Sequence, residues 1–351
     1  MVKVSILIPT MNRPEFVVRL LEYYNLVKSK HPIYIGDASN SINKNKLLKK
    51  INTYKSVLDV NYFHWPNFND LKTLDELVKQ SKEDYCAYIG DDDFLIPNSL
   101  EICANFLEKN LDYRTAQGKA MIFHFKETGP YGKTFFSGEY WKNNSIENDK
   151  SSERFLEFGK NYWTPVFSVK RRKEFLKDLE FYGNMPDKNF GELISNFTFI
   201  SRGKSKFLDC LYLIRQGHNE RYLMKSGTNW IKSPNWNKSL QICIKSLSSI
   251  ISKEDQIGYK KANYIVNKVF DDIIVRSIKK GDKISENFFD KAKNLFKNHV
   301  LFSDLLISIY RNLQAFLFPK KFEMSHLRIL KKNSKYYKDF KPIYKVITNK
   351  F

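Results

Sequence analysis

The chain has few cysteines, and their spacing suits neither metal binding nor redox exchange. Its 351 residues include only Cys86, Cys103, Cys210 and Cys243, and no two of these form a Cys-x-x-Cys pair. Zinc-binding modules and disulfide-stapled secreted domains depend on closely and regularly spaced cysteines, so neither class fits. We interpret the four as buried free thiols and expect a reducing, cytoplasmic environment.

No segment is apolar for long enough to predict a membrane span or a signal peptide. The apolar N-terminus runs directly into polar residues after Pro9. The most apolar late stretch, Val300 to Phe318, is interrupted by Asp304 and Arg311, whereas a transmembrane helix needs about 20 predominantly apolar residues. We therefore expect a cytoplasmic protein and leave open a peripheral contact with the inner face of a membrane.

Glycine-rich phosphate loops are also missing. Neither Gly-x-x-x-x-Gly-Lys-Ser/Thr nor Gly-x-Gly-x-x-Gly occurs among the 14 glycines. A nucleotidyltransferase, which also uses clustered acids on an α/β sheet, would normally carry a glycine-rich basic loop near its N-terminus. That class of enzyme is therefore kept as an alternative only.

Acidic residues are outnumbered by basic ones. The chain has 59 Lys and Arg against 38 Asp and Glu, a formal net charge of +21. This balance favours an anionic partner, although a solvated basic surface explains it equally well. The 20 Tyr and 28 Phe fall mostly within apolar periodic segments, which indicates a core rather than a platform for stacking bases. A nucleic-acid-binding protein is thus the non-enzymatic alternative, and we expect no nucleic-acid partner.

The first hundred residues alternate strand-like apolar runs with helical periodicity. The predicted strands are Lys3–Pro9, Pro32–Asp37, Val60–His64 and Tyr85–Gly90, and the predicted helices are Pro14–Leu21, Asn45–Tyr54 and Asn69–Gln80. This order predicts an α/β fold with a mainly parallel central sheet flanked by helices. Ligands of such sheets bind beyond the carboxyl ends of the strands, and Thr10, Asp37 and Asp91–Asp93 fall at these ends.

The later part of the chain changes character twice. The pattern weakens from Lys126 to Lys160, and then predicts a strand and two helices at Val166–Val169, Arg171–Leu179 and Asp187–Ile200. After Ser226 the chain is Lys-rich with helical periodicity at Leu240–Ile251, Tyr259–Ile278 and Leu301–Phe316. The chain length predicts two domains, which we place at residues 1–225 and 226–351, the second mostly α-helical.

The central chemical feature is the run of acids Asp91-Asp92-Asp93, which follows the strand ending at Gly90. Adjacent carboxylates repel one another, and a divalent cation such as Mg²⁺ or Mn²⁺ would relieve that repulsion through the oxygen ligands it prefers. The competing interpretation is a solvated acidic turn that caps the helix starting near Asn98. The position at a strand end favours the metal site.

An ordered set of motifs resembles glycosyltransferase family 2. The matching segments are Val4–Arg13, Ile35–Ser39, Tyr88–Pro97, Val166–Arg171, Gly191-Glu192-Leu193, Gly203 and Leu211–His218. They look like the family's opening strand, second strand, D-x-D segment, acceptor-side strand, Glu-Asp helix, glycine turn and Tyr-x-x-Arg-Gln-His strand. The resemblance covers about Met1 to Asn219 and leaves the C-terminal third without a counterpart.

The resemblance implies a GT-A fold and the metal-dependent, inverting transfer of a sugar from a nucleoside-diphosphate sugar, with a UDP-sugar as first choice. Mn²⁺ or Mg²⁺ would be the cofactor, and a glycan or lipid-linked hydroxyl the acceptor. Residues 1–125 would bind the nucleotide-sugar and residues 126–225 the acceptor. The chain departs from the family where Gly191-Glu192 replaces Glu-Asp and where Trp65–Lys72 replaces a glycine-rich segment.

On the donor side the resemblance implies a role for each matched residue. Base and ribose would be contacted by Pro9, Thr10, Arg13, Asp37 and Asp91, with Asn67 and Lys72 in the substituted segment. The metal would be held by Asp92 and Asp93, with His218 as a third ligand or a phosphate contact, and Arg215 would pair with the diphosphate. The plainer interpretations are a turn-capping acid for Asp37, a structural histidine for His218 and a pairing with a neighbouring acid for Arg215.

On the acceptor side the resemblance implies that Glu192 is the base that deprotonates the attacking hydroxyl. Periodicity alone describes Glu192 as an ordinary acid on a helix surface. Asp187, on the preceding turn, is the rival base.

The Lys-rich region after Ser226 has two open interpretations. Its amphipathic helices would serve the acceptor or an anionic membrane face. Alternatively, their apolar sides pack on the catalytic domain or on a second copy of the chain, which leaves a homo-oligomer open.

Overall fold

The computed structural model describes residues 2–140, 144–180, 185–217, 227–285, 323–325 and 328–349. The strands are β1 Val4–Thr10, β2 Ile33–Asp37, β3 Val60–His64, β4 Tyr85–Tyr88, β5 Phe94–Leu95, β6 Tyr113–Phe125, β7 Thr134–Glu139, β8 Val169–Arg171 and β9 Lys204–Gly217. The helices are α1 Pro14–Leu26, α2 Ser41–Tyr54, α3 Asp70–Gln80, α4 Pro97–Lys109, α5 Ser151–Lys160, α6 Arg172–Asp178, α7 Lys188–Arg202, α8 Gly227–Ile231, α9 Trp236–Glu254, α10 Tyr259–Ser285 and α13 Tyr337–Thr348, with a 3₁₀ turn η1 at Pro165–Phe167.

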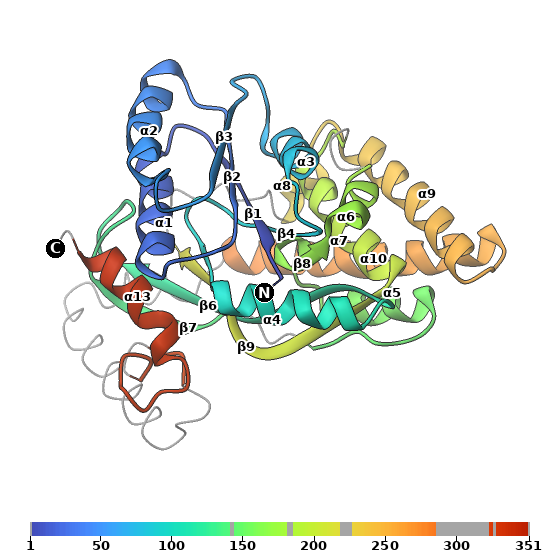
Figure 1. Ribbon diagram of the computed structural model, residues 1–351. Helices are drawn as coiled ribbons and strands as arrows, with labels where there is room; N and C mark the ends of the chain where they lie inside the picture. The colour runs from blue at the N-terminus through green and yellow to red at the C-terminus, as the bar shows by residue number, and fades with distance from the viewer. Residues whose placement is uncertain are drawn as a thin grey trace, which may run out of the picture.

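Within these residues nine strands form one sheet in the order β3-β2-β1-β4-β8-β6-β9-β5, and β7 pairs with β6 (Figure 1). The first four strands along this path are parallel, as predicted. Thr10 lies opposite Asp37, and Asp37 lies opposite His64. This register brings the carboxyl ends of β1, β2 and β3 to one edge of the sheet, which is where the polar residues of the candidate site begin.

The turn after β1 has a defined local cause. Asn12 adopts a left-handed backbone with φ 57°, a conformation that Asn tolerates better than most residues. Its side-chain oxygen accepts hydrogen bonds from Asn40 N at 3.0 Å and Asn43 Nδ2 at 3.2 Å. Pro14 then opens α1, where its missing N–H costs nothing. The turn therefore delivers Arg13 to the carboxyl end of β1.

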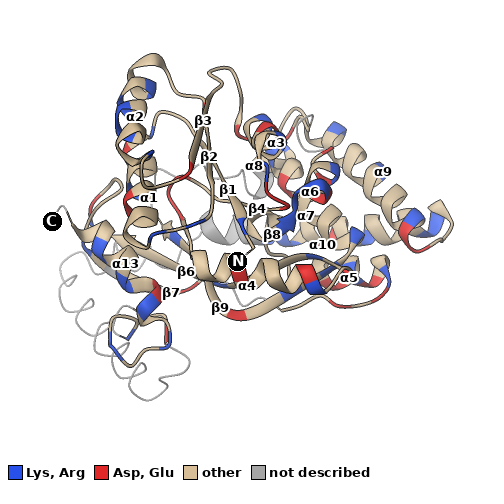
Figure 2. Cartoon of the chain, viewed as in Figure 1, with Lys and Arg blue, Asp and Glu red and all other residues tan. Residues whose placement is uncertain are grey.

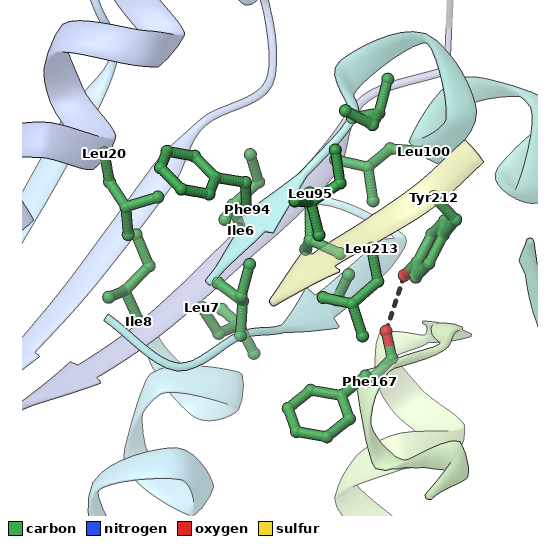
Figure 3. Packing of buried hydrophobic residues seen from close by; sticks show 14 of the residues in the cluster. Ile6, Leu7, Ile8, Leu20, Phe94, Leu95, Leu100, Phe167, Tyr212 and Leu213 are labelled. Atoms are coloured by element: carbon green, nitrogen blue, oxygen red, sulfur yellow. Dashed lines mark hydrogen bonds between the residues drawn. The ribbon is translucent and has the colours of Figure 1, made fainter. Parts of the chain in front are cut away.

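The strand ends that carry the candidate site adjoin closely packed, buried hydrophobic side chains (Figure 3). Ile6 and Ile8 of β1, Leu20 of α1 and Phe94 of β5 have no exposed surface. The hydroxyl of Tyr212, a residue of β9 in the same packed region, donates to the Phe167 carbonyl at 2.7 Å. Close packing of this kind resists small displacements, so the strand ends above it are held in fixed positions.

Six of the described elements have no counterpart in the sequence-based prediction, namely β5, β6, β7, α5, α8 and α13. In β6 the apolar alternation is interrupted by Gln117-Gly118-Lys119, and its register against β9 shifts at the same place. The predicted strand at Val166–Val169 is mostly the 3₁₀ turn η1, followed by the short β8. Buried Lys170 explains the turn, because its ammonium donates to the carbonyls of Pro165, Val166 and Ser168 at 2.7, 2.9 and 3.1 Å.

The described helices of the Lys-rich region pack against the rest of the chain. Phe270 of α10 contacts Phe190 and Phe197 of α7 at centroid distances of 6.4 and 5.7 Å. Helix α13 lies beside α1 (Figure 1), and its Phe340 and Ile343 belong to the same core as β1. The predicted helix Leu301–Phe316 lies outside the described residues. Among the helices that are described, none combines the length and the apolarity needed to cross a bilayer.

We predict that α10 is an integral support of α7. Replacing Phe270, which is 1% exposed, by Ala should lower the free energy of unfolding by about 3–5 kcal/mol, because the buried ring leaves a cavity. The matched control is Tyr264→Ala on the same helix, where the ring is 69% exposed and the expected change is within about 0.5 kcal/mol. Urea denaturation measures both, and equal losses would show that α10 is held in some other way.

Candidate active site

The carboxyl ends of β1 and β4 share a network of hydrogen bonds and ion pairs. The Thr10 hydroxyl donates to Asp91 Oδ2 at 2.7 Å. The Arg13 guanidinium spans two acids, with Nη1 at 2.8 Å from Asp91 Oδ1 and Nη2 at 3.2 Å from Asp92 Oδ2. Pro9, the residue before Thr10, is half-buried. The structure thus gathers Pro9, Thr10, Arg13, Asp91 and Asp92, which were all predicted as site residues.

Asp93 faces away from this edge and is fully buried. Its Oδ2 accepts from Arg215 Nε at 2.7 Å, and its Oδ1 accepts from the Gln216 backbone N–H at 3.0 Å. The Arg215 guanidinium lies 5.0 Å from the centre of the Tyr140 ring and 4.9 Å from that of Phe167. Burial disfavours its charge, but Asp93, Tyr140 and Asp92 together outweigh burial, and the pKa of Arg215 is raised. The plainer interpretation of Arg215, a pairing with a neighbouring acid, therefore describes this structure.

A third arginine, which sequence reasoning missed, underlies the acidic loop. Arg19 of α1 has no exposed surface, and it donates to the Asp92 carbonyl and the Pro130 carbonyl at 2.6 Å each and to Gln216 Oε1. Burial lowers the pKa of Arg19 to about 10, while Asp92 and Asp93 oppose that change. The guanidinium therefore stays charged at neutral pH. A lone Arg between Val18 and Leu20 in an apolar helix face was the available signal.

The pKa of Asp91 is raised to about 7, first by burial and then by the neighbouring charge of Asp92, against the opposing effects of Arg13 and Thr10. A bound cation would favour the ionised form of such a carboxyl. The protonation of Asp91 is therefore open to change by a ligand near neutral pH.

Asp37 lies at the end of β2 and is also fully buried. Its Oδ1 accepts from the Ser39 N–H at 2.8 Å, as in a turn-capping acid, and its Oδ2 accepts from the Tyr62 hydroxyl at 2.7 Å. Burial, followed by this bond, raises the pKa of Tyr62. A contact between Asp37 and a nucleotide stays a prediction, and it would require one of these two donors to yield.

The substituted segment after β3 forms an aromatic stack. Trp65 stacks on Phe63 and Phe68 at centroid distances of 5.2 and 5.5 Å, and Lys72 Nζ lies 4.1 Å from the centre of the Phe68 ring. Lys72 and Asn67 are exposed. In the part of the chain that the structure describes, their side chains form no hydrogen bond or ion pair with the acidic cluster. Lys72 instead lines a groove of about 700 Å³ between α3 and α6.

The two candidate bases on α7 have different surroundings. Asp187 caps the helix, since its Oδ1 accepts from the N–H groups of Asn189 and Phe190 at 3.0 and 3.2 Å. The same carboxylate accepts from Trp230 Nε1 at 3.1 Å and Ser233 Oγ at 2.9 Å. Four donors satisfy it, which describes a structural cap.

Glu192 is held differently. Its Oε1 accepts one hydrogen bond from the Tyr162 hydroxyl at 2.9 Å. Burial raises the pKa of Glu192, while Tyr162 and Arg215 lower it in part. A carboxylate with a raised pKa near a basic group suits general base chemistry. The remaining predicted ligand, His218, lies outside the described residues.

The described residues can hold a divalent cation in one way. No group of three or more described His, Cys, Asp or Glu side chains could enclose a metal. Mg²⁺, however, is commonly held by one or two carboxylates together with substrate phosphates and water. Asp92, which shares Arg13 as counter-ion with Asp91, supplies one such hard oxygen donor at this edge. Asp93 could join only if Arg215 or Gln216 released it, so its assignment as a ligand stays a prediction.

Comparison with known proteins identifies the fold. No protein-family model and no curated sequence matches the chain. Among solved structures, S. aureus TarS 1–349 superposes with a TM-score of 0.52 at 12% identity, over 82% of this chain and 77% of that one. TarS 1–349 in complex with UDP-GlcNAc gives a TM-score of 0.54 at 13% identity, and its complex with UDP gives 0.51 at 13%, over the same shares. The predicted α/β fold of the GT-A type, with a mainly parallel sheet flanked by helices, is thereby confirmed.

We predict that the inner and outer acids of the cluster have separable roles. Replacing Asp93 by Ala should lower the free energy of unfolding by about 3–5 kcal/mol, because it leaves the buried Arg215 without its partner. Replacing Asp92 by Ala should cost about 1 kcal/mol, because Arg13, with which its Oδ2 pairs, is part-exposed. Chemical denaturation of both variants tests this, and a loss for Asp92→Ala as large as that for Asp93→Ala would contradict it.

Proposed function

We propose that the chain is a glycosyltransferase that takes a sugar from a nucleoside-diphosphate sugar bound at the carboxyl ends of β1, β2 and β4. One observation carries the proposal: Asp91 and Asp92 stand with Arg13 at the strand ends of a fold shared with TarS. TarS was solved with UDP-GlcNAc and with UDP, which supports a UDP-sugar as donor. The order of motifs along the chain supports membership of glycosyltransferase family 2.

The diphosphate would lie beside Asp91 and Asp92, with Mn²⁺ or Mg²⁺ held by Asp92 and ribose facing Asp91. Such a cation screens the negative charge that grows on the leaving diphosphate. Arg13 would turn from the carboxylates toward the phosphates. Pro9, Thr10 and Asp37 would line base and ribose, and His218 would contact the metal or a phosphate.

The base proposed for the reaction is Glu192. Among the described residues Tyr162 donates to Oε1 and none donates to Oε2, which leaves Oε2 available for an acceptor hydroxyl, whereas Asp187 accepts from four donors. Because burial raises the pKa of Glu192, the carboxylate would hold the hydroxyl proton more strongly than an exposed acid does. Attack by that hydroxyl on the sugar carbon, opposite the departing diphosphate, would invert the anomeric configuration.

The acceptor is proposed to be a glycan or lipid-linked hydroxyl, reached from the side of α7. Figure 2 marks Lys and Arg positions in blue on several helices, among them α2 and α13, and this charge supports approach to an anionic acceptor or membrane face. The proposal also includes a cytoplasmic location, peripheral contact with a membrane and homo-oligomerisation. It divides the chain into a catalytic domain at residues 1–225 and a helical region at residues 226–351.

The first test concerns metal-assisted nucleotide binding. Isothermal titration of UDP into wild-type protein should give tighter binding with Mn²⁺ than with EDTA. The variant Asp92→Asn, which keeps the size of the side chain but loses its charge, should bind UDP equally in both conditions. Asp271→Asn on the exposed side of α10 is the control, because it makes the same change of net charge outside the acidic cluster. Undiminished Mn²⁺-dependent binding by Asp92→Asn would refute the assignment.

The second test concerns the base. Glu192→Gln keeps the shape of the side chain but cannot accept the proton. UDP release from UDP-GlcNAc, with water as the acceptor, should fall by at least about a hundredfold, the scale of general base catalysis, while UDP affinity is unchanged. An active Glu192→Gln beside an inactive Asp187→Asn would transfer the role to Asp187.

A further inference from the structure

A directed chain of three hydrogen bonds ends on Glu192. The Val166 backbone N–H donates to Asn196 Oδ1 at 2.8 Å. Asn196 Nδ2 donates to the Tyr162 oxygen at 2.9 Å, and the Tyr162 hydroxyl donates to Glu192 Oε1 at 2.9 Å. Asn196 has no exposed surface and lies one helical turn beyond Glu192 on α7.

The direction of this chain is determined at its buried end. A backbone N–H can only donate, so the atom of Asn196 that faces Val166 must be the carbonyl oxygen. The amide nitrogen of Asn196 then faces Tyr162 and occupies the tyrosine oxygen as a donor. The tyrosine proton is therefore left to Glu192, and an ionised carboxylate accepts it more strongly than a neutral carboxyl does.

Packing holds the tyrosine ring independently of these bonds. The ring lies 5.2 Å from that of Phe158 and 6.1 Å from that of Phe197 between centroids. Both phenylalanines have no exposed surface. Removing the hydroxyl therefore leaves the ring in place, which allows the hydrogen bond to be tested apart from the fold.

We propose that Tyr162 and Asn196 are positioning residues, which keep Glu192 ionised and aim one of its oxygens at the acceptor. This inference rests on the proposed function for its catalytic meaning, while the hydrogen-bond chain stands on its own geometry. The charged and titratable groups that act on Glu192 are Tyr162, after α5, and Arg215 on β9. Both favour the carboxylate against the effect of burial, so loss of either should favour its protonated form.

The test is the variant Tyr162→Phe. Carboxyl ¹³C NMR, with the Glu192 resonance assigned by its absence from Glu192→Gln, should show that Glu192 titrates at a higher pH than in wild type. The acid limb of kcat for UDP-GlcNAc hydrolysis should move to higher pH in parallel. At a pH on that limb kcat should fall about tenfold, the scale of one hydrogen bond to a charged group, with KM unchanged.

Tyr113→Phe is the matched control, because the Tyr113 hydroxyl donates to a different acid, Glu147. It should change neither the Glu192 titration nor the limb. Asn196→Asp provides a second variant that keeps the acceptor for Val166 N–H but withdraws the donor from Tyr162. It should also raise the pH at which Glu192 titrates, because the Tyr162 proton can then turn to the new carboxylate and because the added negative charge itself disfavours ionisation of Glu192.

The outcomes separate the two proposals. An unchanged Glu192 titration in Tyr162→Phe overturns the positioning role, whatever the activity. A titration that moves to higher pH in protein with no UDP-GlcNAc hydrolysis confirms the hydrogen-bond chain and counts against the proposed function. If the Glu192 titration moves to higher pH but the acid limb of kcat does not, Glu192 is not the base, and Tyr162 and Asn196 have no positioning role.

Discussion

The structure at the strand ends depends on arginine–carboxylate pairing. Three adjacent acids repel one another, and a bound cation is one way to relieve that repulsion. The protein supplies another, because Arg13, Arg19 and Arg215 reach the acidic loop from two different elements and from the turn after β1. Arg19 and Asp93 are fully buried, where an ion is tolerated only when it is paired and hydrogen-bonded. The loop after β4 is thus held in one conformation before any ligand binds.

This pairing divides the labour within the acidic run. Asp93 and its partner Arg215 tie the loop to β9, and Arg19 ties it to α1 through the Asp92 carbonyl. Asp91 and Asp92 are left at the outer edge, where their counter-ion Arg13 is part-exposed. A metal–diphosphate group can therefore replace Arg13 without opening the buried ion pair. Away from the acidic run, α5 and α10 pack against α7, which is the helix that carries Glu192.

Much of the fold could be predicted because local patterns in the sequence indicate its strands and helices. The first four strands and three helices follow from apolar runs and periodicity, and the strand ends directed attention to Asp91 and Asp92. β6 was not predicted, because the local alternation of apolar residues is interrupted at Gly118. The long pairing of β6 with β9 accommodates that interruption. Pro165 and the buried ammonium of Lys170 converted a predicted strand into a 3₁₀ turn.

The candidate site was predictable only in part for a similar reason. Motif order pointed to Glu192, with Asp187 on the preceding turn as its rival. Only their neighbours separate a carboxylate that accepts from Tyr162 from a helix cap that accepts from four donors. Arg19, Gln216, Tyr162 and Asn196 act through contacts between distant segments, which a single sequence does not display. Asn67 and Lys72 were inferred from position after β3, and the aromatic stack there turns Lys72 toward the groove between α3 and α6.

The most direct measurement is a crystal structure of the full chain with UDP and Mn²⁺. The account predicts the diphosphate beyond the carboxyl ends of β1 and β4, with the metal about 2.1 Å from an oxygen of Asp92 and Arg13 turned from Asp92 toward phosphate. The pair of Asp93 with Arg215 should be unchanged. UDP bound instead in the groove between α3 and α6, with Arg13 still on Asp91 and Asp92, would contradict it.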